Sequence, residues 1–310
     1  AGRWIATNPL GEIPGWHIDA LVSLMPAARW GRIASEFLSA VKDPTELMAF
    51  WNTVLGLASD EGATKVSARD IEGRVEEYTN TAGQVVDVPD GVGVLTSFTD
   101  VQGSWLELLV KGWGVGEESW DILHERIPGD PEAATTWARL DALLAKSYRH
   151  QFGGDMRIMC SLVDVGAYHD AACRFVKPRE RRMVFGSMGD RTGGPDHVEL
   201  KAPSRANAQG VRVYTLGTYR LKARLFGRLG LRPGPRYMHF RAYNADRCNG
   251  FDGEYWGQVE SEKRVTKRPK GGGRPKQMYV QTRERNEWVD LQVGNLGALL
   301  VLGAPVRDRM

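Results

Sequence analysis

The 310-residue sequence predicts an α/β protein in which helices flank a central mixed sheet and a smaller helix-rich segment comes first. Strand-like and helix-like runs alternate along most of the chain, which is typical of α/β domains. The first three strand-like runs are joined by short turns, which indicates an antiparallel meander. Aspartates also stand at the ends of two apolar runs and on the last predicted helix. These observations predict a folded domain in which carboxylates converge.

Residues 1–85 form the first predicted segment. Apolar residues at helical spacing predict two helices there, and one shorter apolar run precedes them. The predicted elements are a short buried strand or helix at 15–25 and helices at 30–41 and 44–55. A polar stretch at 59–66 and a weakly patterned stretch at 79–90 are candidate linkers. We therefore place the main boundary near residue 85 and the larger domain over residues 86–310.

The larger domain begins with the meander. Its three β-rich runs lie at 92–99, 105–113 and 120–127. Pro131 follows Asp130 and predicts the start of a helix, because proline is favoured at the first helical position. Apolar residues at helical spacing continue this helix over residues 133–148. The remaining predicted elements are strands at 157–163, 183–185, 211–216, 236–240 and 277–281 and helices at 168–175, 219–229, 254–262 and 288–302.

Three antiparallel strands, a helix, a fourth strand and then alternating helices and strands are the element order of an RNase H-like domain. Many α/β folds begin with a hairpin, so the order alone does not decide the fold. The acidic residues strengthen the prediction of an RNase H-like fold, because Asp100 follows the first of these strands, Asp164 follows the fourth and Asp290 lies on the last helix. The sequence therefore predicts an RNase H-like nuclease domain.

The three aspartates are the candidate catalytic and metal-binding residues. A carboxylate at the end of a buried strand is costly unless a cation pairs with it. Converging carboxylates share divalent ions, and Mg²⁺ prefers oxygen ligands. Two such ions clamp the attacking and leaving oxygens in phosphodiester hydrolysis. The alternative for Asp100 and Asp164 is a strand-end cap or a salt bridge. Glu287 competes with Asp290, because residues three apart share a helix face. We favour Asp290 as the ligand.

Composition narrows the class of protein. Hydrophobic residues make up 42% of the chain and charged residues 25%, which is ordinary for a globular protein. No apolar run approaches the roughly 20 residues that span a bilayer, so we expect no membrane partner. The three cysteines form no CxxC pair, which fits a reducing compartment. The first residues lack a signal-peptide pattern and an initiator Met, so we expect the chain to begin inside a longer protein.

Short peptides in order along the chain are similar to those of a known family. They are Asp100-Val101-Gln102, Leu106-Glu107, Gly112-Trp113-Gly114, Asp164-Val165-Gly166 with His169, and Asn286-Glu287 with Asp290. Together they resemble the nuclease portion of the lambda-type phage terminase large subunit, although Ser is more usual than Val165. Further upstream, residues 50–56 resemble the end of that family's ATPase domain and its linker. The resemblance covers nearly the whole chain.

The resemblance implies an RNase H-like endonuclease that cuts double-stranded DNA during phage genome packaging, with two Mg²⁺ or Mn²⁺ ions bound by the three aspartates. It implies the terminase ATPase portion, a small terminase subunit and the portal ring as partners, in the cytoplasm of the infected bacterium. Residues 1–85 would then be the trailing part of the ATPase domain and its linker. No GxxxxGK[ST] phosphate loop is present, so we expect no ATP hydrolysis by this chain.

Other polar residues are candidates for supporting roles. Glu287 would cap or support the site, and His169 and Asp170 would either orient water or simply open a solvent-facing helix. Lys222 matches a family lysine and would contact DNA or the active site. The segment 263–276 contains seven basic residues and no acid, and its glycines and prolines predict a loop or hairpin tip that contacts phosphates. Its candidate DNA-binding residues are Lys263, Arg264, Lys267, Arg268, Lys270, Arg274 and Lys276.

Two other functions fit the sequence. A resolvase-like or transposase-like nuclease would keep the fold and would prefer branched over linear DNA. A non-catalytic DNA-binding module would bind DNA in a salt-sensitive way without metal-dependent cleavage. The intact set of three aspartates favours an enzyme.

Overall fold

The computed structural model describes residues 18–41, 44–57, 68–190, 198–203, 205–243, 250–267 and 276–303. Contacts within the chain divide it into two compact units, Ala1–Ala63 and Thr64–Met310. The sequence predicts a boundary near residue 85, whereas this division lies earlier. One physical reason is Arg74, which donates hydrogen bonds to the carbonyl oxygens of Leu229 and Met238 and so belongs with the larger unit.

The smaller unit, within its described residues, consists of short helices. These are the 3₁₀ helices η1 (Ala20–Val22) and η2 (Pro26–Ala28) and the α-helices α1 (Trp30–Ala40) and α2 (Pro44–Thr53). Ile33, Ala40 and Phe50 form its small core. Both predicted helices are confirmed. The buried strand or helix predicted at 15–25 is wrong over the described part, because η1 is one turn without a buried residue.

The larger unit is built on a nine-stranded mixed sheet, which confirms the predicted class of fold. The strands follow the order β1-β11-β4-β3-β2-β7-β8-β10-β9. Their bounds are β1 (Val75–Glu76), β2 (Val94–Val101), β3 (Trp105–Trp113), β4 (Ser119–Pro128), β7 (Ile158–Asp164), β8 (Val184–Gly189), β9 (Leu200–Lys201), β10 (Val213–Leu216) and β11 (Met238–Arg241). β2, β3 and β4 form the predicted antiparallel meander, while β7 runs parallel to β2 and β8 runs parallel to β7.

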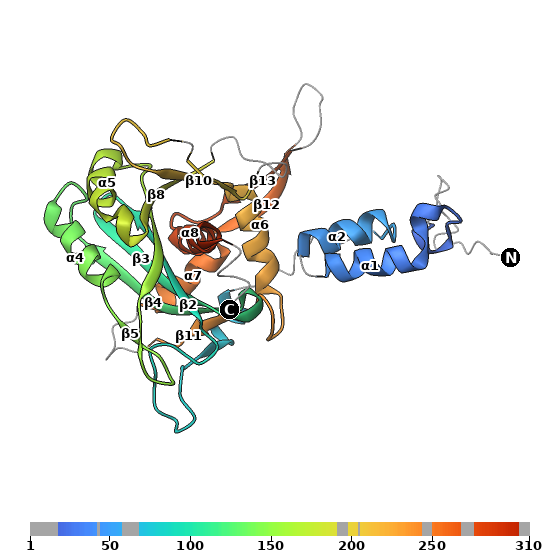
Figure 1. Cartoon of the computed structure of the whole chain (residues 1–310), viewed down its shortest axis with the longest axis horizontal. Coiled ribbons are helices and arrows are strands. Elements are labelled where there is room, and N and C mark those ends of the chain that lie inside the picture. Colours follow the sequence, from blue (N-terminus) through green and yellow to red (C-terminus); the bar gives the residue numbers. More distant parts are fainter. Residues whose placement is uncertain are drawn as a thin grey trace. The chain divides into compact units, whose positions relative to one another are not determined.

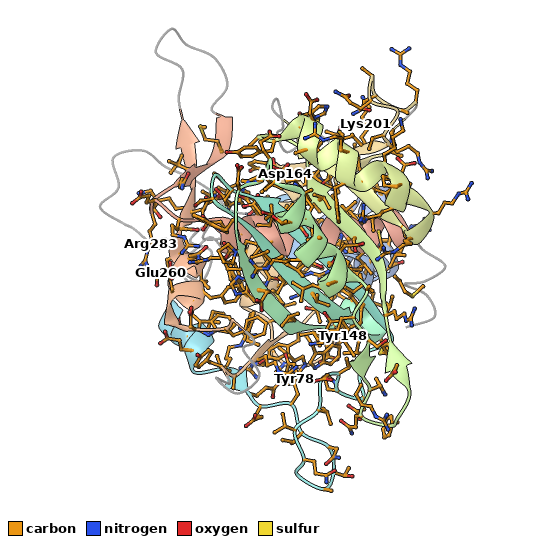
Figure 2. The ribbon with its side chains drawn as sticks, turned by 90° about the vertical axis from the view of Figure 1, so that its left-hand side faces the viewer. Tyr78, Tyr148, Asp164, Lys201, Glu260 and Arg283 are labelled. Carbon is orange, nitrogen blue, oxygen red and sulfur yellow. The ribbon has the colours of Figure 1, made fainter. Side chains whose placement is uncertain are left out.

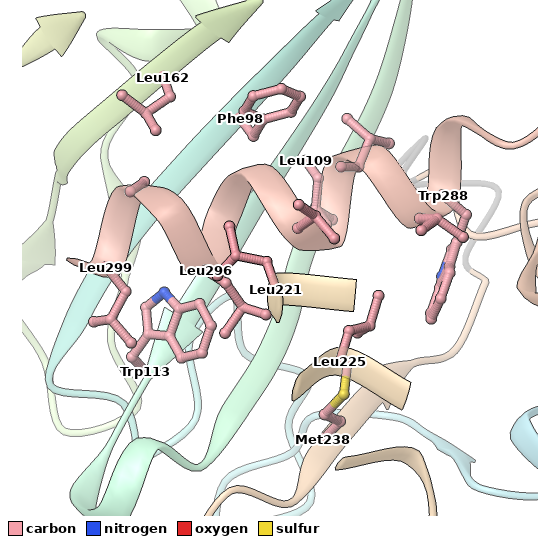
Figure 3. Close-up of a cluster of buried hydrophobic side chains, with 14 of the residues drawn as sticks. Phe98, Leu109, Trp113, Leu162, Leu221, Leu225, Met238, Trp288, Leu296 and Leu299 are labelled. Carbon is pink, nitrogen blue, oxygen red and sulfur yellow. The ribbon is translucent and has the colours of Figure 1, made fainter. Parts of the chain in front are cut away.

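Helices cover both faces of this sheet (Figure 1). Their bounds are α3 (Ala68–Glu72), α4 (Ala134–Leu144), α5 (His169–Val176), α6 (Thr218–Leu229), α7 (Gly253–Gly257) and α8 (Glu287–Leu302). Side chains of α4 and α5 pack on one face, in a core that includes Trp137 and Phe175. Side chains of α6, α7 and α8 pack on the other, around Phe98 and Leu162 (Figure 3). Each sheet face therefore has its own hydrophobic core.

Helix α8 is buried on nearly all sides, because it lies between the sheet and α6. Gly294 permits this, since a Cβ there would lie 2.0 Å from the ring of Phe98. Asn295 fixes the helix on the sheet by accepting from the Thr96 hydroxyl and donating to the Leu109 carbonyl oxygen, at 2.8 and 3.1 Å. None of the helices in the described ranges has the length and apolarity needed to cross a membrane.

Some predicted elements differ from the structure. The predicted helix at 254–262 consists of α7 and the 3₁₀ helix η6 (Gln258–Glu260), and Glu262 instead begins strand β12 (Glu262–Lys267). β12 pairs with β13 (Lys276–Gln281) as a separate antiparallel hairpin. Pro131 does not begin α4, because a turn from Asp130 to Ala133 comes first. The 3₁₀ helices η3 (Val115–Glu117) and η4 (Lys177–Arg182) and the short pair β5 (Tyr148–Arg149) and β6 (Asp155–Met156) complete the described elements.

Candidate active site

The three aspartates lie at one end of the sheet. Thr99 of β2 pairs with Val163 of β7, so Asp100 and Asp164 each follow a paired residue at the same end of two parallel strands. Asp290 lies in the first turn of α8, which packs against both strands. Asp164 stands at the end of the sheet opposite to Tyr78 and Tyr148 (Figure 2). Segments far apart in sequence thus bring these carboxylates to one region.

Burial and mutual repulsion change how these acids ionise. Burial raises the pKa of Asp100 from 3.8 to about 7; the negative charges of Asp290 and Asp164 raise it too, while a hydrogen bond from Gln102 lowers it. Burial also raises the pKa of Asp290 to about 6, against the nearby charge of Lys222. The pKa of Asp164 is raised by burial as well. The three groups are therefore close enough to repel one another.

Protein groups hold these carboxylates in place. The Gln102 side-chain amide donates to Asp100 Oδ2 at 2.5 Å, and the Gly166 backbone N–H donates to Asp164 Oδ1 at 3.3 Å. Lys222 Nζ lies 3.7 Å from Asp290 Oδ1. No three histidine, cysteine, aspartate or glutamate side chains of the described residues approach closely enough to hold a metal ion as they stand. These oxygen donors nevertheless suit a hard divalent cation, because their repulsion is what such a cation would relieve.

Of the supporting candidates, the structure brings Lys222 and Glu287 to this region. Lys222, on α6, forms an ion pair of 2.5 Å with Glu262 in addition to its contact with Asp290. Glu287 is buried and accepts from Arg285 Nε at 3.3 Å. The charge of Asp290 raises the pKa of Asp100 more than that of any other acid does, which favours Asp290 as the acid that faces the strand ends.

The other two candidates pair elsewhere. His169 Nδ1 donates to the carbonyl oxygen of Val165 at 2.9 Å, and its Nε2 lies 3.4 Å from Gln209 Oε1. Asp170 is exposed and accepts from the side-chain amide of Gln209 at 3.1 Å. Both residues therefore contact Gln209 at the start of α5.

Glu107 stands opposite Asp100 on the neighbouring strand and has no solvent exposure. Burial acts to raise its pKa, but hydrogen bonds from His124 and Trp105 outweigh this and lower the pKa below its ordinary value. His124 Nε2 lies 2.8 Å from Glu107 Oε1, and its Nδ1 lies 2.7 Å from the carbonyl oxygen of Gly250. Glu107 is thus an ionised, paired carboxylate beneath the site.

Sequence reasoning missed Glu262. Its side chain is only 4% exposed, and it accepts from both Lys222 and the side-chain amide of Asn286. The sequence predicts a helix over residues 254–262, and at the end of such a helix Glu262 carries no sign of a functional role. The available signal was its place as the last acid before the basic segment.

That basic segment forms the hairpin of β12 and β13. Lys263 is exposed and Arg264 is half-buried; Lys267 and Lys276 lie opposite each other in the paired strands. The remaining predicted DNA-binding residues lie outside the described residues: Arg268, Lys270 and Arg274. Tyr279 of β13 packs against α6, with its ring centroid 5.5 Å from that of Phe226. The hairpin base is thereby fixed beside the helix that carries Lys222 (Figure 1).

Comparison with known proteins identifies relatives. A family model described as the terminase large subunit gpA, endonuclease domain, matches residues 13–309. The terminase large subunit of Enterobacteria phage P21 is 28% identical over 324 residues, covering 97% of this chain and 48% of that protein. The terminase large subunit of Escherichia phage lambda is 28% identical over 284 residues, covering 89% of this chain and 42% of that protein.

The chain thus spans about half the length of these relatives or less. No solved structure gives a significant match to it. The family model extends over nearly all of the sequence, including the ends of β2 and β7 and the first turn of α8. The chain therefore belongs to the family of terminase large subunit endonuclease domains.

Proposed function

We propose that this chain is a metal-dependent endonuclease with an RNase H-like fold, which cuts double-stranded DNA during phage genome packaging. The observation that carries the proposal is the gathering of Asp100, Asp164 and Asp290 at one end of the sheet, with the pKa of each raised. The sheet order β4-β3-β2-β7-β8, with an antiparallel meander followed by parallel strands, supports the fold. Family membership supports the reaction.

The three aspartates would hold two Mg²⁺ or Mn²⁺ ions, which suit carboxylate oxygens. When bound, the ions supply the positive charge that activates water and offsets the charge developing on the scissile phosphate. Asp100 is fixed by Gln102 and Asp164 by the backbone of Gly166, so both carboxylates are oriented before substrate arrives. Lys222 beside Asp290 adds a positive charge at the same end of the sheet.

Substrate binding would involve the basic hairpin. Exposed Lys263 and half-buried Arg264 suit contacts with DNA phosphates, which carry no sequence information. Such binding weakens as salt rises. In the infected bacterium, the ATPase portion of the terminase, a small terminase subunit and the portal would be the partners, and this chain would cut without hydrolysing ATP.

The replacement Asp100→Asn tests this function, because it keeps the shape of the side chain and removes its charge. We expect cleavage of plasmid DNA in Mn²⁺ to fall about 100-fold or more, because the loss of a charged ligand would misplace the ions, and a misplaced reacting group can cost about 100-fold. Asp155→Asn is the matched control, because Asp155 is exposed on β6. Wild-type cleavage by the Asp100 variant would show that the site is wrong.

The same assay separates the other two functions. Preferential cutting of branched over linear DNA would indicate a resolvase-like or transposase-like enzyme. Salt-sensitive DNA binding without cleavage in Mg²⁺ or Mn²⁺ would indicate a non-catalytic binding module.

A further inference from the structure

Glu262, the first residue of β12, is a buried carboxylate with one oxygen unused. Its side chain is 4% exposed. Oε1 accepts from Lys222 Nζ at 2.5 Å and from Asn286 Nδ2 at 3.1 Å. Oε2 is buried and has no hydrogen-bond partner among the described residues. A buried carboxylate oxygen without a partner is costly, so its presence points to a group that completes it.

The two hydrogen-bond partners of Glu262 also lie close to Asp290. Lys222 Nζ, which pairs with Glu262, also lies 3.7 Å from Asp290 Oδ1. Asn286 Nδ2, which donates to Glu262, also lies 3.4 Å from Asp290 Oδ2. The two carboxylates therefore share one ammonium group and one amide, and Glu262 is one of the charges that raise the pKa of Asp290.

In the part of the chain that the structure describes, the positive charge near these carboxylates does not balance their negative charge. Asp100, Asp164, Asp290 and Glu262 bring four carboxylates to the region, and Lys222 is the cation that contacts two of them. Within the described residues, this one ammonium leaves an excess of negative charge, and because Asp100 and Glu262 are buried, that excess is unfavourable without further cations. A divalent ion with oxygen ligands would reduce that excess.

We propose that Glu262 is a further carboxylate ligand of the divalent cation held by Asp290, through its unpartnered Oε2. The inference rests on the proposed function, since it adds a ligand to the same site. Without the cation, Lys222 neutralises part of the charge on Glu262 and Asp290. With the cation bound, Glu262, the first residue of β12, would coordinate the same ion as Asp290 and so connect the basic hairpin to the proposed catalytic site.

The test is Mn²⁺ binding by the whole chain, without DNA, measured by isothermal titration calorimetry. Glu262→Gln keeps the length of the side chain and an acceptor for Lys222 but removes the charge. We expect the Mn²⁺ dissociation constant to rise about 10-fold or more, by analogy with the loss of groups around metal sites. Glu260→Gln is the matched control, because Glu260 is half-exposed and pairs with Arg283 at 2.9 Å. We expect the control to bind like the wild type.

Glu262→Asp is a second variant, which keeps the test decisive if Glu262→Gln fails to fold. It keeps the charge and shortens the reach, so it should weaken Mn²⁺ binding less than Glu262→Gln does. Circular dichroism without metal checks that each variant is folded. The inference is overturned if Asp290→Asn loses Mn²⁺ binding while Glu262→Gln and Glu262→Asp both bind like the wild type. If Asp290→Asn and Asp100→Asn also bind like the wild type, the proposed metal site itself is wrong, and the inference falls with it.

Discussion

At the scale of single residues, the acids at the end of the sheet lower the stability of the folded protein when they ionise. Asp100 is 7% exposed, faces two other aspartates and has a pKa of about 7, far above the ordinary value of 3.8. A carboxylate in such a place weakens the folded state when it ionises. The site therefore carries a cost in stability, which a bound cation would offset.

Asp100→Asn should make the cation-free protein more stable at neutral pH. The folded pKa of Asp100, about 7, lies above the unfolded value near 3.8. The unfolded chain therefore loses this proton first, and wild-type stability falls as pH rises from about 4 to about 7. The variant lacks this loss, so its advantage should reach the order of a few kcal/mol near pH 8 and shrink toward pH 4. Thermal unfolding in EDTA measures this difference in stability between the variant and the wild type at each pH.

Asp155→Asn serves as the control for this experiment as well, because the exposed Asp155 should give the same small effect at every pH. A lower stability of Asp100→Asn than of the wild type near pH 8 would contradict the expected repulsion.

The sequence predicted some of these residues and not others, for a physical reason. Asp100 and Asp164 end apolar runs, and the strand pairing that joins them follows from the element order. Glu262 belongs to a polar stretch whose local pattern gives no sign of burial. Its proximity to Asp290 arises from the packing of the hairpin beside α6 and α8, and a local pattern does not contain such contacts.

At the scale of elements, α8 determines where Asp290 lies. The helix approaches β2 closely at Gly294, beside the ring of Phe98. It is also tied to β3 through Asn295 and to β3 and β4 through Gln292, which accepts from Lys111 and donates to Asp121. A displacement of α8 would therefore move Asp290 away from the ends of β2 and β7.

Gly294→Ala should separate α8 from the sheet. The added Cβ would lie 2.0 Å from Phe98, so the ring or the helix must shift. We expect the free energy of unfolding to fall by about 1–3 kcal/mol, the usual cost of overpacking a core. We also expect cleavage to fall, because Asp290 moves with the helix. Urea unfolding measures the first effect and plasmid cleavage the second.

Gly31→Ala is the matched control, since Gly31 lies in helix α1 with no heavy atom within 4 Å of an added Cβ. It should leave the unfolding of the larger unit unchanged. Equal stability of Gly294→Ala and the wild type would show that the close packing of α8 is not required.

The elements themselves were largely predictable. The long strands of the meander, β7 and helices α1, α6 and α8 carry clear periodicity or apolar runs, and the structure confirms them. The two-residue strands β1, β5, β6 and β9 have no such pattern, because they are too short to show one and only their pairing with another strand defines them. For β12 the sequence predicts a loop or hairpin tip from residue 263, and the structure pairs β12 with β13 as a hairpin that begins at Glu262.

At the scale of the whole molecule, the contacts separate residues up to 63 from the rest. All residues of the proposed site belong to the larger unit, as do both hydrophobic cores of the sheet. The smaller unit has its own core of Ile33, Ala40 and Phe50. The larger unit should therefore fold by itself.

A chain of residues 64–310 should keep the main unfolding transition of the 310-residue protein and its cleavage of plasmid DNA in Mn²⁺. The physical reason is that the sheet, its two hydrophobic cores and the three aspartates all lie within residues 64–310. Differential scanning calorimetry and the cleavage assay check this. Aggregation, or folding without cleavage, would show that residues 1–63 are needed.

The position of α8 along the chain also has a consequence for protein synthesis. The ribosome makes every strand of the nine-stranded sheet before it reaches Asp290. A nascent chain that has passed only the strands lacks both the third aspartate and the helix that fills one sheet face. The ability to cut DNA would therefore arise in the same step that completes this core, so unfinished chains would leave the nucleic acid around them intact.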